Sequence, residues 1–157
     1  MIRLYRLLIR RFAANPFDGE GSFRFGGRWS SAGTRLAYAS EYQSLAMLEF
    51  LVHLQPGDAP DELALAVADV PDSVSREHLR TEGLPRNWRA TAAPGALARF
   101  GDDFARLAHA CLLFVPSALA PSERNCLINP AHPEFARIQV RPLEPFAIDL
   151  RLTQGRR

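Results

Sequence analysis

The chain has 157 residues, of which 47% are hydrophobic and 23% are charged, and its formal net charge is +2. These values are typical of one globular domain, and they exclude a disordered chain and a strongly basic protein that coats nucleic acid. No apolar run is long enough for a transmembrane helix, and the N-terminus lacks the apolar stretch of a signal peptide, so we expect a cytoplasmic protein that binds no membrane.

The first predicted element is a strand over residues 2–8, where apolar and charged side chains alternate. Arg6 lies within it, either as a solvated outward residue or as a ligand-binding cation. Residues 13–25 contain Pro16, Asp18 and two glycines, and this composition predicts a loop.

A glycine-rich stretch follows this loop, with the sequence Gly26-Gly27-Arg28-Trp29-Ser30-Ser31-Ala32-Gly33-Thr34. Glycines allow sharp turns and a close approach of the backbone to a ligand. Arg28 carries the planar cation that is best suited to bind a phosphate or carboxylate through two parallel hydrogen bonds. The stretch matches neither the P-loop nor the dinucleotide-binding glycine pattern, so an ordinary hairpin with a solvated Arg28 is the alternative.

Residues 36–40 then predict a short strand that carries Tyr38. Ser40 and Gln43 have the spacing of a capping box, which predicts a helix that runs to about Leu54 and stops before Pro56.

Glu49 lies on this helix, at the edge of an apolar stripe formed by Leu45, Leu48 and Val52. A carboxylate at that position is expected to be half-buried. Glu49 is therefore either a functional acid or a surface residue paired with His53, which follows it by four positions.

The second half of the chain alternates predicted strands and helices. We expect strands at 61–70, 111–115, 137–141 and 146–150, a short helix at 75–80 and a longer helix from 95 to about 109. Trp88 is expected to pack in the core or in a lid, and residues 154–157 to form a frayed tail. Cys111 and Cys126 allow at most one disulfide and form no metal-ligand pattern.

Residues 121–133 contain Asn125 and Asn129 between several prolines. Prolines fix the path of the backbone, so polar side chains there are held stiffly and either face a ligand or bond the local backbone.

Taken in order, these stretches resemble the RES domain family, which is named for Arg, Glu and Ser residues. The matching pieces are Leu4-Tyr5-Arg6, residues 26–34, Tyr38-Ala39-Ser40, residues 45–54, Val115-Pro116-Ser117 and residues 125–133. Two positions depart from the usual family pattern: Ser30 stands where Asn is more common, and Cys126 stands where Tyr is common.

The resemblance implies a RES domain over residues 1–150, a C-terminal tail over 151–157, and a compact α+β fold similar to that of ADP-ribosyltransferase toxins. Its sheet is expected to be mixed or antiparallel, with flanking helices. Family members are toxins of toxin–antitoxin pairs that destroy NAD+, and the antitoxin is an Xre-type helix-turn-helix protein. The resemblance thus implies an enzyme with NAD+ as its substrate and no metal. DNA contact would come through the antitoxin, and a homodimer or a higher toxin–antitoxin complex is also expected.

The resemblance assigns active-site roles to Arg28, Tyr38, Glu49 and Ser117, and looser binding roles to Arg6 and Asn125. In this hypothesis Glu49 stabilises the ribose carbon as its bond to nicotinamide breaks, and Arg28 binds the pyrophosphate. Two other functions stay open: transfer of ADP-ribose to a protein, and a module that only binds a regulatory protein or nucleotide.

Overall fold

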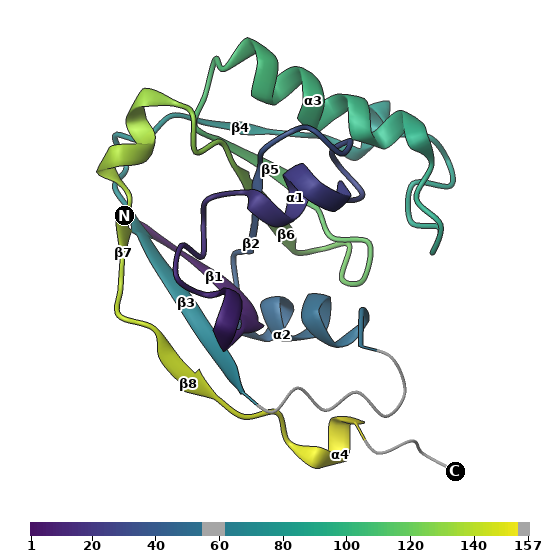
Figure 1. Cartoon of the computed structure of the whole chain (residues 1–157). Coiled ribbons are helices and arrows are strands. Elements are labelled where there is room, and N and C mark those ends of the chain that lie inside the picture. Colours follow the sequence, from purple (N-terminus) through teal and green to yellow (C-terminus); the bar gives the residue numbers. More distant parts are fainter. Residues whose placement is uncertain (55–61, 154–157) are drawn as a thin grey trace.

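The structure is a computed structural model that describes residues 1–54 and 62–153 (Figure 1). One mixed sheet organises it, in the order β4-β5-β6-β2-β1-β3-β7, with β8 also paired to β3. The strands are β1 (Ile2–Ile9), β2 (Ala37–Ser40), β3 (Leu63–Val70), β4 (Arg76–His78), β5 (Leu112–Pro116), β6 (Arg124–Ile128), β7 (Gln139–Val140) and β8 (Glu144–Phe146). The pair β4–β5 is parallel and the other pairs are antiparallel, which confirms the predicted α+β class.

Helices flank this sheet on different parts of its surface (Figure 1). They are α1 (Glu20–Phe25), α2 (Gln43–Leu51), α3 (Ala98–Leu107) and α4 (Leu150–Thr153), and the 3-10 turns are η1 (Arg10–Phe12), η2 (Thr81–Gly83), η3 (Gly95–Leu97) and η4 (Pro133–Arg137). α2 packs on β1 and β2, α1 contacts β2, and Phe104 of α3 packs with residues of β5 and β6.

Successive side chains of a strand point to opposite sides of the sheet, and strands β2, β3, β5 and β6 bury side chains on both sides. On β2, Ala37 and Ala39 belong to one apolar cluster, while Tyr38 packs against a second cluster that contains Trp29 and Phe104. Full burial explains the near-continuous apolar sequences of β3 and β5.

The sheet is least continuous between β1 and β2. β1 pairs with β3 over its whole length, but its register with β2 is the single pair Tyr5 with Ser40. Figure 1 accordingly shows two parts, one with β4, β5 and α3 and the other with β1, β3 and α2, which join at β2. Side chains from both parts meet at this junction.

Several predicted elements are confirmed, namely the first strand, the strand with Tyr38, the strand before Pro71 and the helix after Pro94 with its following strand. Others are wrong. Residues 13–25 are not all loop, because α1 forms within them, and residues 75–80 contain strand β4 instead of a helix. The last two predicted strands are shorter or shifted. β7 has only two residues, and β8 shares only Phe146 with the strand predicted at 146–150.

The predicted capping box at Ser40 is also wrong. α2 begins at Gln43 with Tyr42 as its N-cap, and the Ser40 hydroxyl donates to Asn125 instead of capping the helix. α2 ends at Leu51, not Leu54, and Leu48 and Val52 are exposed, so the apolar stripe is only partly buried. The predicted stop before Pro56 and the tail at 154–157 lie outside the described residues.

Candidate active site

Glu49 is the centre of a hydrogen-bond network that joins three elements. Its carboxylate is half-buried on α2, as predicted, and its Oε1 atom accepts a hydrogen bond from Ser117 Oγ at 2.9 Å and another from Asn125 Nδ2 at 2.6 Å. Among the hydrogen bonds of the described residues, none joins Glu49 to His53, so the alternative pairing is not seen. None of them goes to Glu49 Oε2 either. The two hydrogen bonds therefore anchor one carboxylate oxygen and make the environment of the carboxylate asymmetric.

Ser117 is held so that its hydroxyl proton points to Glu49. It is fully buried just after β5, and its Oγ accepts hydrogen bonds from the backbone N–H groups of Leu119 and Ala120, each at 3.1 Å. A serine hydroxyl has one proton and two lone pairs. Because both lone pairs are used, the proton is free to go only to the carboxylate.

Arg28 lies at the tip of a tight turn. Gly27 and Ser30 form an isolated antiparallel β-bridge across this turn, with a 2.8 Å hydrogen bond from Gly27 N–H to the Ser30 carbonyl. The guanidinium donates through Nη1 to the Trp88 carbonyl at 2.7 Å and through Nη2 to the Ala90 carbonyl at 3.0 Å. Arg28 is thus not a solvated hairpin residue, since it ties the glycine-rich loop to the segment after η2.

The Tyr38 side chain lies directly against this turn. A Cβ atom on Gly27 would lie 2.7 Å from the Tyr38 hydroxyl, so only glycine allows the turn to come this close. The hydroxyl accepts a hydrogen bond from Trp29 N–H and lies 2.8 Å from Ser30 Oγ. Burial raises the pKa of Tyr38 above its ordinary value, although the hydrogen bond from Trp29 N–H acts in the opposite direction.

The direction of the hydroxyl chain follows from counting protons. Ser22 Oγ donates to the Thr34 carbonyl and lies 2.9 Å from Ser30 Oγ. Since each hydroxyl has one proton, Ser30 must donate to Ser22, and Tyr38 must donate to Ser30. The Tyr38 proton is therefore used inside the protein.

Asp102 of α3 anchors the other end of the glycine-rich loop. Its carboxylate accepts hydrogen bonds from the Ser31 backbone N–H and hydroxyl and from the Thr34 hydroxyl, at 2.9, 2.6 and 2.7 Å. Burial raises the pKa of Asp102, but these hydrogen bonds together outweigh that effect and hold it below its ordinary value. Sequence gives no signal for this anchor, which joins residues about 70 positions apart.

Arg6 contacts groups outside the Glu49 hydrogen-bond network. Its Nη1 donates to the Pro16 carbonyl at 2.6 Å, and its Nη2 lies next to Gly21 of α1. Burial lowers the pKa of Arg6, while the Asp18 carboxylate acts in the opposite direction. Arg6 is therefore not a solvated outward residue.

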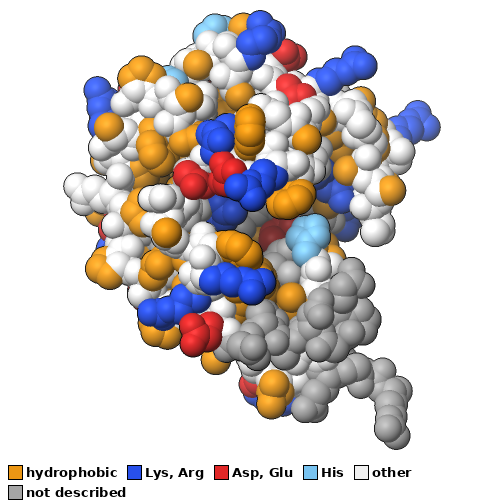
Figure 2. All heavy atoms as spheres, viewed as in Figure 1, with side chains coloured by type: hydrophobic (Ala, Val, Ile, Leu, Met, Phe, Trp, Pro, Cys, Tyr) orange, Lys and Arg blue, Asp and Glu red, His pale blue; other side chains and the backbone are white. Residues whose placement is uncertain are grey.

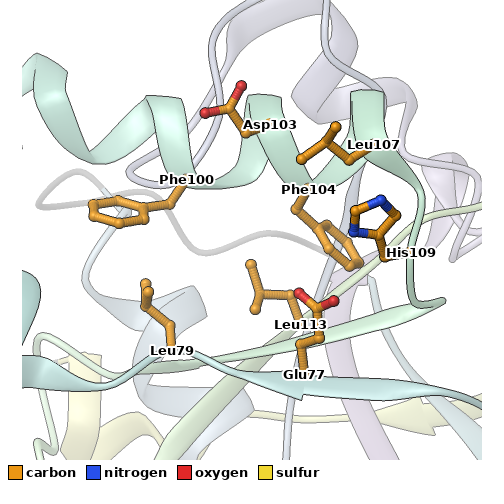
Figure 3. A pocket seen from close by; sticks show the side chains of 8 residues that line it. All are labelled: Glu77, Leu79, Phe100, Asp103, Phe104, Leu107, His109 and Leu113. Carbon is orange, nitrogen blue, oxygen red and sulfur yellow. The ribbon is translucent and has the colours of Figure 1, made fainter.

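On the face shown in Figure 2, basic side chains gather on both sides of a recess between the surfaces of α1 and α2. Two separate cavities lie along α3. In one, of about 180 Å³, Phe100 and Phe104 of α3 face Leu79 and Leu113, with Glu77 and His109 at one end (Figure 3). Neither cavity is lined by Arg28 or Glu49, so the convergence of these two residues on one ligand stays a prediction.

The described residues contain no group of three or more His, Cys, Asp or Glu side chains placed to hold a metal ion. Cys111 and Cys126 are buried free thiols, so the disulfide that the sequence allowed does not form. Burial raises the pKa of Cys111 to about 11 and that of Cys126 well above its ordinary value, which makes both thiols unreactive. Within those same residues, no helix is long and apolar enough to cross a bilayer.

The structure thus joins three of the predicted residues, Glu49, Ser117 and Asn125, by direct hydrogen bonds. It places Arg28 and Tyr38 together at the glycine-rich turn, and Arg6 beside α1. Sequence reasoning did not find Ser40, Ser30 or Asp102 as parts of the site. Two of them had a signal: Ser30 departs from the family's usual Asn, and Ser40 belongs to one of the matching pieces.

Comparisons with known proteins bear on the family and the fold of the chain. The RES domain family model matches residues 3–149. A protein from Yersinia enterocolitica named Toxin Res is 38% identical over 95% of this chain and 98% of its own length. The Prs ADP-ribosylating toxin of a Sphingobium species is 37% identical over 91% of this chain and 90% of its own length.

A solved structure shares the fold. It is the crystal structure of the M. tuberculosis MbcT–MbcA toxin–antitoxin complex, which matches with a TM-score of 0.75 and 19% identity over 92% of this chain and 84% of that one. This chain therefore shares its fold with a chain of that complex, and the likeness to ADP-ribosyltransferase toxins stays what the resemblance implies. With a family match over nearly its whole length, the chain belongs to the RES domain family, as a toxin related to those of toxin–antitoxin systems.

Proposed function

We propose that this RES-family toxin consumes NAD+ by breaking the bond between nicotinamide and ribose, with Glu49 as the catalytic carboxylate. The observation that carries the proposal is the asymmetry of this carboxylate: Ser117 and Asn125 both bond Oε1, which leaves Oε2 for the ribose. A carboxylate fixed before the substrate arrives needs no reorganisation in the transition state, and such preorganised electrostatic contacts are often the largest contribution to catalysis.

The chemistry requires one bond to break and one to form. The C1′–N bond of the nicotinamide riboside leaves its electron pair on nitrogen, so the positively charged pyridinium departs as neutral nicotinamide. The ribose carbon then carries oxocarbenium character, which the Glu49 charge stabilises through the ribose hydroxyls. An oxygen of water or phosphate bonds to that carbon, and a proton from the acceptor is released to solvent or to Glu49.

The glycine-rich turn supplies the proposed binding groups. Arg28 uses two of the five N–H donors of a guanidinium on carbonyls, so others remain for the pyrophosphate. The Tyr38 ring is proposed to stack on nicotinamide, since its hydroxyl proton is used by Ser30. Arg6 and Asn125 are proposed to complete the substrate contacts. No metal is needed, because the leaving group departs as a neutral base.

Transfer of ADP-ribose to a protein is the second candidate function. It uses the same bond cleavage but a protein side chain as the acceptor. The Sphingobium relative, named as a Prs ADP-ribosylating toxin, favours this candidate.

We also propose a protein partner that restrains the toxin. The structural neighbour was solved as a toxin–antitoxin complex, which supports an antitoxin for this chain. The Xre type of that antitoxin, a cytoplasmic site of action and a homodimeric or higher assembly are parts of the same proposal.

The proposal is tested by incubating the purified protein with NAD+ that is radiolabelled in its adenylate phosphate, with and without phosphate and with and without cell extract. We expect free nicotinamide by chromatography, with ADP-ribose as co-product in water or its phosphorylated form in phosphate. Label on a macromolecule would favour ADP-ribosyl transfer. Binding of NAD+ without release of nicotinamide, or no binding, would contradict both functions and favour a module that only binds.

A further inference from the structure

We propose that Ser40 is a positioning residue that sets the orientation of the Asn125 amide and, through it, the position of the Glu49 carboxylate. This inference rests on the proposed function of Glu49. Ser40 is the last residue of β2 and is 3% exposed, and its hydroxyl donates to Asn125 Oδ1 at 2.7 Å. Among the hydrogen bonds of the described residues, Ser40 therefore has none to the carboxylate, and its side chain is almost fully removed from solvent.

The two ends of the Asn125 amide have different chemistry. The amide oxygen only accepts hydrogen bonds and the amide nitrogen only donates them. With Ser40 donating to Oδ1, the nitrogen must point away from β2, and there it donates to Glu49 Oε1 at 2.6 Å. A rotated amide would place its oxygen against the carboxylate oxygen, and the two would repel each other.

The backbone makes this arrangement rigid. Ser40 and Asn125 are directly opposite each other in the antiparallel pair of β2 and β6, so their side chains leave the sheet on the same face. Asn125 is itself 9% exposed, which leaves little water to replace a lost partner. The Ser40 hydroxyl is thus the group that distinguishes the two amide orientations.

The same residue also explains a failed prediction. Ser40 has the spacing of a helix cap, but its hydroxyl is used across the sheet, and α2 begins at Gln43 without a side-chain cap. The serine lies at the junction of the two parts of the sheet, where β2 meets both β1 and β6.

The test is a double-mutant cycle with NAD+ as the substrate. We expect Ser40→Ala to lower kcat about 10- to 100-fold, the cost of a slightly misplaced catalytic group, with KM changed less than about twofold. Added to Asn125→Ala, the same substitution should have no further effect, because its partner is gone. Ser40→Thr keeps the hydroxyl and should restore most of kcat. Ser75→Ala, which removes a hydroxyl bonded to Glu134 away from the site, is the matched control and should leave kcat unchanged.

Hydrogen exchange of the Asn125 side-chain amide, followed by NMR, gives a readout that needs no activity. Ser40→Ala should remove its protection, and Ser40→Thr should keep it. An unchanged kcat, additive effects in the cycle, or an amide that stays protected in Ser40→Ala would overturn the proposal. If the unmodified protein releases no nicotinamide, the proposed function fails, and amide exchange alone then decides the role of Ser40.

Discussion

The two halves of the proposed site are held in different ways. The acid half consists of Glu49, Ser117, Asn125 and Ser40, and its hydrogen bonds join side chains on or beside β2, β5, β6 and α2. The arginine half is Arg28 on a turn, and its hydrogen bonds go to backbone carbonyls of Trp88 and Ala90. The acid half is fixed by the sheet, whereas the arginine half joins two connecting segments.

This difference indicates what each half contributes. Side chains locked by the sheet suit a group that must already be in place when charge develops in the transition state. A cation whose hydrogen bonds go to uncharged carbonyls keeps its full positive charge, which suits a group that binds a phosphate. We therefore expect substitutions in the acid half to lower kcat, and substitutions in the arginine half to raise KM.

The largest effect is expected for Glu49→Gln. The Gln Oε1 atom still accepts from Ser117 and Asn125, but an uncharged NH2 group replaces the oxygen left for ribose. We expect NAD+ turnover, measured by nicotinamide release, to fall by about 100-fold or more. Glu41→Gln removes a nearby carboxylate that pairs with Arg124 and serves as the control. Wild-type turnover in Glu49→Gln would remove Glu49 from the mechanism.

Arg28→Lys should give the second largest effect. Lysine keeps the charge but loses the fork that spans two carbonyls. Since a hydrogen bond to a charged group contributes about 1.5–3 kcal/mol, we expect KM for NAD+ to rise at least about 10-fold, with a smaller change in kcat. Arg24→Lys, at an exposed pair with Glu20, should leave KM as it is. A fall in kcat alone would place Arg28 with the acid half instead.

Gly101→Ala tests the support of the arginine half. A Cβ atom there would lie 1.9 Å from the Trp29 carbonyl oxygen, so α3 and the glycine-rich turn must move apart. Forcing an extra methyl into such a packed contact costs about 1–3 kcal/mol of unfolding free energy. Thermal denaturation should show a lower Tm. Gly83→Ala, where a Cβ meets nothing within 4 Å, is the control, and equal Tm values for the two variants would contradict the close approach.

Tyr38→Phe is expected to have the smallest effect on turnover. The ring stays, while the Trp29 N–H and the Ser30 hydroxyl each lose a partner. We expect a loss of about 1–2 kcal/mol in stability, measured by urea denaturation, and a change in kcat of only a few fold. Tyr38→Ala, which removes the ring, should lose far more activity. A Phe variant as inactive as the Ala variant would mean that the hydroxyl itself acts on the substrate.

Part of the fold could be predicted because four of the eight described strands, β1, β2, β3 and β5, have apolar or alternating sequences that need no partner to identify them. β3 and β5 are examples. β4 was wrongly predicted as a helix because its three residues form a strand only by pairing with β5, and pairing between distant segments leaves no local pattern. α1 was missed because it has six residues, one of them glycine, and no apolar period.

The site was predictable in its residues but not in its connections. The resemblance pointed to Glu49, Ser117 and Asn125 separately, and nothing in the sequence linked the serine to a carboxylate 68 positions away. The Arg28 partners were unpredictable for another reason: they are backbone carbonyls, which every residue has. At Ser40 the local spacing led to a wrong prediction, because a serine that caps a helix and a serine that bonds across a sheet look the same in the sequence.

The position of β6 in the sheet has a consequence for how the toxin is made. β6 lies between β5 and β2, and it supplies Asn125, the residue through which Ser40 reaches Glu49. A chain still being synthesised has Glu49 long before it has residue 125, and until then β2 and β5 have no strand between them. The growing polypeptide therefore lacks the assembled acid half until about four fifths of the sequence has been translated, so a product truncated before Asn125 is expected to lack it as well.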